Sequence, residues 1–276
     1  MNEAIVVGVD GSSGAAGALD WAADEAVRRG APLLLVHASK LLEPGNMLKE
    51  DALERLREER RHLLESTREG LLGERPDLRV GLELADDDPA RVLTELSRTA
   101  PMVVVGTRGA GGFERLLLGS VGLHVAAHGY CPVVVVPRGG ERGRGEHVVL
   151  GVDERHRQSA AIGWAFAEAE LRGVRLAALR AVNGYGAPGQ RIGEEMMLSE
   201  ALAGQVSDHP DVVVEYRLPE TSAARALVEA SEDAALLVLG ARKRRLGFGT
   251  VLGRVGHAVL RHSACPVVVV AEPEED

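Results

Sequence analysis

Aromatic residues are scarce in this sequence of 276 residues, and it has no excess of basic charge. Phe, Trp and Tyr together make up 3% of the chain, which leaves few rings on which the bases of a single-stranded nucleic acid could stack. Acidic residues outnumber basic ones, 41 to 32, and the formal net charge of −9 disfavours binding to a phosphate backbone. We therefore expect no nucleic-acid partner.

Long apolar runs and cysteines are also scarce. No apolar run approaches the roughly 20 residues that span a bilayer, and no basic segment precedes the first apolar stretch as in a secretory signal. Two cysteines, Cys131 and Cys265, are too few for a disulfide framework. We therefore expect a cytoplasmic protein without a membrane partner. With 45% hydrophobic residues, mainly Val, Leu and Ala, the chain can still bury a core.

An internal repeat covers nearly the whole sequence. The segment AIVVGVD, which ends at Asp10, recurs as HVVLGVD, which ends at Asp153, an offset of 143 positions. The offset falls to 134 near the end of each copy, where Cys131-Pro132 recurs as Cys265-Pro266. The copies therefore differ in length only in their middle, where loops tolerate insertions. We predict tandem domains over 1–137 and 147–276, joined by a polar, glycine-rich linker over 138–146.

Each copy alternates short apolar runs with helical patterns. Val and Leu dominate the runs, which predict strands; in the first copy these are 4–9, which suits burial on both faces, 33–36, also buried, and 80–84, 102–105 and 133–136. Ser12 or Ser13 and Asp88 can begin helices between the strands, and Gly30 can end one. Strands that alternate with helices form a parallel sheet through right-handed crossovers. The predicted fold is α/β, with two tandem doubly wound domains, each a five-stranded parallel sheet with helices on both faces.

Two unusual segments of the first copy follow strands, at the sheet edge where open parallel sheets bind ligands. One is GVDG, which contains Asp10, and the other is the loop from Gly106 that leads to Gly119 and Ser120. Glycines let backbone amides approach a phosphate, and a helix N-terminus favours anions. The Ser120 hydroxyl could donate to a phosphate, and Asp10 could accept from a ribose. Turn chemistry alone explains a lone glycine-rich loop as well, and Ser120 could instead cap its own helix.

The spacing of the glycines favours a nucleotide. Two residues separate Gly106 from Gly109, and nine more precede Gly119-Ser120. This pattern, Gly-x2-Gly-x9-Gly-Ser, resembles the ATP-binding signature of the universal stress protein family. GVDGS and the closing CPVVVVP of the first copy are similar to that family too, as are GVDE, GARK, LGRVG and CPVVVV in the second. The resemblance covers nearly the full chain.

This resemblance implies an adenine nucleotide α-hydrolase-like fold and an ATP site in the first copy, with ADP or AMP as other ligands and Mg²⁺ as a companion of the phosphates. It assigns the ribose to Asp10 and the base to Val9 and Ala38. The implied phosphate contacts are Gly106, Gly109, Gly119, Ser120 and Val121, and Arg108 is a further candidate. The resemblance also implies a homodimer formed by the last strands, 133–136 and 267–270, which pair between copies or between chains because apolar edge strands need a partner.

The second copy departs from this signature. It keeps Asp153, Gly240 and Gly253, but Lys243 replaces the second glycine and Arg254 replaces the serine. A side chain at Lys243 obstructs close approach of a phosphate, whereas the basic cluster 242–245 could attract phosphate in another geometry. A solvated loop explains the cluster equally well. We predict that this copy binds ATP weakly, or not at all in the usual pose.

Other chemistries lack the residues they need. No lysine follows a glycine, which excludes a Walker-type phosphate loop. His124 and His128 have a zinc-like spacing without a third ligand, and His128 and His262 better suit helix ends, so we expect no metal site. The signature contains no general base, so we expect no catalytic residue and no enzyme. We predict an ATP-dependent stress-response regulator read by an unknown protein partner. A slow ATP hydrolase or phosphotransferase, and a structural stress module without nucleotide, remain alternatives.

Overall fold

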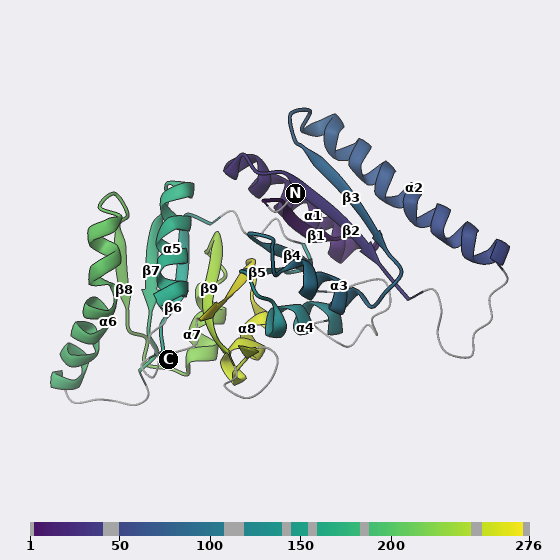
Figure 1. The fold of residues 1–276 in the computed structure, drawn as a ribbon. Helices are drawn as coiled ribbons and strands as arrows, with labels where there is room; N and C mark the ends of the chain where they lie inside the picture. The colour runs from purple at the N-terminus through teal and green to yellow at the C-terminus, as the bar shows by residue number, and fades with distance from the viewer. Residues whose placement is uncertain are drawn as a thin grey trace. The chain divides into compact units, whose positions relative to one another are not determined.

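The computed structural model describes residues 3–40, 50–107, 119–139, 145–153, 159–182, 188–243 and 250–272. The chain divides into two compact units, Met1–Arg138 and Gly139–Asp276, and Figure 1 shows the elements of both. Each unit is an α/β structure, and each is described below by itself.

The described part of the first unit contains a parallel sheet with the strand order β3-β2-β1-β4-β5. Its strands are β1 (Ile5–Gly8), β2 (Leu33–Ala38), β3 (Val80–Ala85), β4 (Val103–Gly106) and β5 (Val133–Val136). The apolar side chains of β1, β4 and β5, and those of β2 up to Val36, are buried, as expected for strands covered on both faces. The predicted five-stranded parallel sheet is confirmed.

Helices α1 (Ser13–Arg29), α2 (Glu50–Glu74), α3 (Pro89–Leu96) and α4 (Ser120–His128) connect or follow these strands. In the sheet, β2 and β3 lie on one side of β1, and β4 and β5 lie on its other side. Right-handed crossovers therefore place α1 and α2 on one face and α3 and α4 on the other. Ser12 caps α1, left-handed Gly30 ends it, and Asp88 caps α3, as predicted.

The second unit repeats this architecture. Its parallel strands are β6 (His147–Gly151), β7 (Arg175–Leu179), β8 (Val214–Arg217), β9 (Leu236–Lys243) and β11 (Val267–Glu272), in the order β8-β7-β6-β9-β11. Its helices are α5 (Ser159–Arg172), α6 (Pro188–Asp208), α7 (Ala223–Ala230) and α8 (Arg254–His262). A short strand, β10 (Thr250–Val251), pairs antiparallel with β9. The predicted duplication of a doubly wound fold is therefore confirmed.

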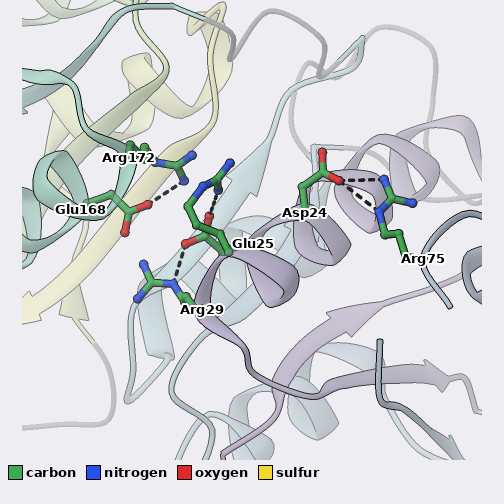
Figure 2. Close-up of polar contacts among 7 residues, drawn as sticks. Asp24, Glu25, Arg29, Arg75, Glu168 and Arg172 are labelled. Atoms are coloured by element: carbon green, nitrogen blue, oxygen red, sulfur yellow. Dashed lines mark hydrogen bonds and ion pairs between the residues drawn. The ribbon is translucent and has the colours of Figure 1, made fainter. Parts of the chain in front are cut away.

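The first helix of each unit carries a matching ion pair near its C-terminal end (Figure 2). Glu25 lies 2.5 Å from Arg29 in α1, and Glu168 lies 2.6 Å from Arg172 in α5. Both carboxylates are buried, and a buried charge is costly unless an opposite charge accompanies it. The structural repeat thus includes a charge pair that the sequence motifs did not reveal.

Candidate functional site

The candidate site lies where the winding of the first sheet reverses. Strand β1 pairs with β2 on one side and with β4 on the other, so the carboxyl ends of all three strands meet at one edge (Figure 1). Open parallel sheets bind ligands at such a switch point. The structure thereby brings Val9 and Asp10, which follow β1, to the same edge as Ala38 at the end of β2 and Gly106 at the end of β4.

The carboxylate of Asp10 is oriented by the start of α1. Its Oδ1 accepts a hydrogen bond from the Ser12 backbone N–H at 3.0 Å, and the side chain is half-buried. Gly11, between these two residues, has φ 76°, a left-handed conformation that favours glycine. The turn therefore holds an anionic hydrogen-bond acceptor at the edge of the sheet.

Gly106 has a packing role in addition to the predicted contact with phosphate. A Cβ at this position would lie 2.7 Å from the carbonyl carbon of Gly14 and closer still to its oxygen. Because Gly14 is in the first turn of α1, the absent side chain at Gly106 allows this helix to approach the end of β4. The close approach links the two segments that were singled out in the sequence.

The N-terminus of α4 is held beside the end of β4. Gly119 donates its backbone N–H to the Thr107 carbonyl oxygen at 2.6 Å. Gly119 is the N-cap, Ser120 is the first helical residue, and no side chain caps the helix. The alternative in which Ser120 caps its own helix is therefore wrong. The first turn, with Ser120 and Val121, instead offers amides that have no acceptor within the helix, as at any helix start.

His37 also belongs to this region, although no sequence motif includes it. The ring is buried at the end of β2, and its Nδ1 lies 2.7 Å from the Val9 carbonyl oxygen. Burial lowers the pKa of His37, and the bond to Val9 acts in the opposite direction. The ring is therefore neutral at pH 7 and Nδ1–H is the donor. A lone histidine within the apolar run LLLVHA was the available signal.

We expect the protein to lose stability as the pH falls below about 6.5, the ordinary pKa of histidine. Burial lowers the pKa values of His37, His124 and His147, so the unfolded chain takes up protons that the folded chain resists. The stabilisation is present above this pH and is lost towards the lowered pKa values. Urea unfolding at about pH 7.5 and about pH 5.5 measures it. The variant His37→Asn should lose less stability than wild type over this range; an equal loss would contradict the role of His37.

Two predicted phosphate contacts, Arg108 and Gly109, lie outside the described residues, as does the side chain of Lys243. The structure does describe the backbone that follows Gly240 in the second unit. Strand β9 continues past Gly240 and pairs Ala241 and Arg242 with the end of β11. Residues 242 and 243 also pair with β10. A backbone ladder thus follows Gly240, whereas β4 ends at Gly106 in the first unit.

The remaining predicted residues of the second unit are also visible. Asp153 is exposed, unlike half-buried Asp10, while Gly253 caps α8 and Arg254 is its exposed first residue. Arg180 stands where the first unit has His37 and forms an ion pair of 2.6 Å with Glu194 of α6. This sheet edge therefore has an ion pair at the position where the first unit has a buried histidine.

The histidines singled out in the sequence lie at helix ends. His128 and His262 are the last residues of α4 and α8, and His128 Nδ1 lies 2.8 Å from the His124 carbonyl oxygen. Within the part of the chain that the structure describes, no group of three or more His, Cys, Asp or Glu residues could hold a metal ion. None of the described helices is long and apolar enough to cross a membrane.

The two cysteines should be unreactive in the folded protein. Burial raises the pKa of both the Cys131 and the Cys265 thiol to about 12, and only the thiolate is a good nucleophile. We expect iodoacetamide to label neither thiol appreciably near neutral pH and both after unfolding in urea, as followed by intact-mass spectrometry. Rapid labelling of a folded thiol would contradict this prediction.

Comparisons with known proteins agree with this architecture. The model of the universal stress protein family matches residues 1–137 and 145–271. A universal stress protein of Mycolicibacterium smegmatis is 35% identical over 282 residues, covering 96% of each chain. The universal stress protein Rv2623 of Mycobacterium tuberculosis is 32% identical over 295 residues, covering 97% of this chain and 96% of its own. The crystal structure of a universal stress protein from Archaeoglobus fulgidus matches the fold with a TM-score of 0.75 at 17% identity, over 98% of each chain.

Proposed function

The chain belongs to the universal stress protein family, and from that premise we propose that it is an ATP-binding regulator of the stress response whose first unit holds the nucleotide. One observation carries the proposal. The end of β1 with Asp10, the end of β4 with Gly106 and the start of α4 converge on one sheet edge, where the Gly119 N–H bonds the Thr107 carbonyl at 2.6 Å.

Each part of this edge suits one part of an adenine nucleotide. The carboxylate of Asp10, held by the Ser12 N–H, can accept hydrogen bonds from the ribose hydroxyls. The first turn of α4 supplies backbone amides and the Ser120 hydroxyl to the phosphates, and its dipole favours their charge. Val9 and Ala38, at the ends of β1 and β2, would contact the base. In this proposal Gly106, Arg108, Gly109 and Val121 complete the phosphate site.

We assign binding rather than catalysis to this site. Asp10 already accepts from Ser12, and the residues proposed to contact the phosphates, namely glycines, Ser120, Val121 and Arg108, include no general base. ATP would regulate by favouring one conformation that a protein partner recognises, which requires that ATP binds the two conformations with different affinity. We further propose that the protein is a cytoplasmic homodimer formed through its last strands and that Mg²⁺ accompanies the phosphates.

Isothermal titration calorimetry on nucleotide-free protein tests this function. ATP, ADP, AMP and GTP are titrated separately, with and without Mg²⁺. We expect dissociation constants for ATP on the order of micromolar, and binding of GTP weaker by about tenfold or more. Absence of adenine-nucleotide binding, or equal affinity for GTP, would overturn the proposal.

A further inference from the structure

The two units differ at one position near the end of their second strands, β2 and β7. His37 in the first unit and Arg180 in the second occupy equivalent positions, because the β1–β2 and β6–β7 ladders have the same register. We propose that this position determines which unit accepts the base of a nucleotide. The inference rests on the proposed function and deepens it, since it makes His37 a positioning residue and Arg180 an obstacle.

In the first unit His37 fixes the backbone beside the proposed base site. Its Nδ1–H donates to the Val9 carbonyl oxygen at 2.7 Å, and the Val9 N–H donates to the Val36 carbonyl oxygen at 2.8 Å. Both backbone polar groups of Val9 are thereby satisfied, which orients the following residue, Asp10. The ring is compact and buried, and its Nε2 lies 3.4 Å from the Ser39 hydroxyl, so the ring is held in place at the end of β2.

In the second unit the same backbone carries a longer, charged side chain. The Val152 N–H donates to the Leu179 carbonyl oxygen at 2.9 Å, as at Val9, so the strand ends match. Arg180, only 6% exposed, reaches Glu194 of α6 with its Nε at 2.6 Å. Displacing a guanidinium from a buried ion pair leaves an uncompensated charge, which is strongly unfavourable. A base is therefore excluded from the end of β7 by a pair that cannot readily open.

This obstacle is independent of the changes on the phosphate side. There the ladder between β9 and β10 follows Gly240, and Arg254 begins α8. The difference between His37 and Arg180 instead lies at the ends of β2 and β7, on the side proposed for the base. A substitution at His37 can therefore test the base side alone, because the phosphate side of the first unit stays intact.

The test compares variants of the full-length, nucleotide-free protein by calorimetric titration with ATP and GTP. His37→Arg introduces the side chain of the second unit, and His37→Met removes the hydrogen-bond donor without adding charge. Both should weaken ATP binding by about tenfold or more and reduce the preference for ATP over GTP. His37→Asn, whose Nδ2 can replace the ring donor, should restore affinity to within about threefold of wild type. Arg180→His changes the same position in the other unit and should leave the ATP affinity of the first unit unaltered.

Urea unfolding verifies that each variant is folded, and His37→Met supplies the test if His37→Arg does not fold. Wild-type ATP affinity in the folded His37→Met or His37→Arg variant would overturn this inference and leave the proposed function intact. Equal losses in His37→Asn and His37→Met would overturn the role of the hydrogen bond to Val9. A wild-type protein without nucleotide affinity would overturn the proposed function itself.

Discussion

Replacing Asp10 with Ala should weaken ATP binding by ~100-fold or more, whereas Asp153→Ala should have no effect. Hydrogen bonds to a charged group contribute about 1.5–3 kcal/mol each, and about 1.4 kcal/mol corresponds to a tenfold change in affinity. Two ribose hydroxyls that lose a charged acceptor therefore account for the expected loss. Asp153 is the equivalent residue of the second unit, where it is exposed and lies beside the strand end that Arg180 occupies.

The Asp10→Asn variant removes the negative charge of the carboxylate and preserves the local structure. Its amide oxygen can still accept from the Ser12 N–H, which Asp10 does at 3.0 Å, so the start of α1 should be preserved. We expect an affinity between those of wild type and Asp10→Ala, measured by calorimetric titration with ATP. A loss of affinity in Asp153→Ala as large as that in Asp10→Ala would contradict a single competent site.

The second large effect is expected at Gly106, where Ala should destabilise the first unit by about 3 kcal/mol and abolish ATP binding. The added Cβ would meet the backbone of Gly14, which cannot rotate away as a side chain could, so α1 or β4 must shift. Either shift would separate the end of β1 from the start of α4. Asp10 and the amides of α4 could then no longer bind the same nucleotide.

A tryptophan reporter restricts this measurement to the first unit. The chain has two tryptophans, Trp21 on α1 and Trp164 on α5, so a Trp164→Phe background leaves fluorescence from α1 alone. Gly70→Ala is the matched control, because Gly70 lies within α2 and a Cβ there meets nothing within 4 Å. We expect that control to stabilise the unit by about 0.5–1 kcal/mol in urea unfolding. An equal response of the two variants would contradict the packing role of Gly106.

Local chemistry made most of the fold predictable. Ser12 and Asp88 each accept from the backbone N–H groups of a helix start, and Gly30 adopts the left-handed conformation that ends α1. These effects depend on residues within a few positions of one another. The buried strands were equally evident, because continuous apolar runs suit a sheet covered on both faces. The alternation of these runs with helices then determined the doubly wound order.

Long-range contacts were not predictable in the same way. The packing of Gly106 on Gly14 joins segments that are distant in sequence, so the glycine could be assigned only to phosphate binding. His37 bonds the Val9 carbonyl across two strands, and its partner is a backbone atom that leaves no signal in the sequence. Both contacts become visible only when β1, β2 and β4 lie side by side.

The second unit illustrates the limit of motif spacing. Gly240 and Gly253 are as far apart as Gly106 and Gly119, yet a β-ladder follows Gly240. Spacing alone therefore does not determine which backbone structure follows such a glycine. The Arg180–Glu194 pair was also unpredictable, because Glu194 lies in the middle region where the copies diverge in length. The roles proposed for Arg108 and Gly109 remain predictions.

The number of nucleotides bound per chain tests the central claim most directly. Full-length protein saturated with ATP is exchanged into volatile buffer, and native mass spectrometry counts the bound nucleotides on wild type, Asp10→Ala and Asp153→Ala. One site in the first unit predicts one adenine nucleotide per chain in wild type and in Asp153→Ala, and none in Asp10→Ala. Two nucleotides per chain, or one that persists in Asp10→Ala, would contradict it.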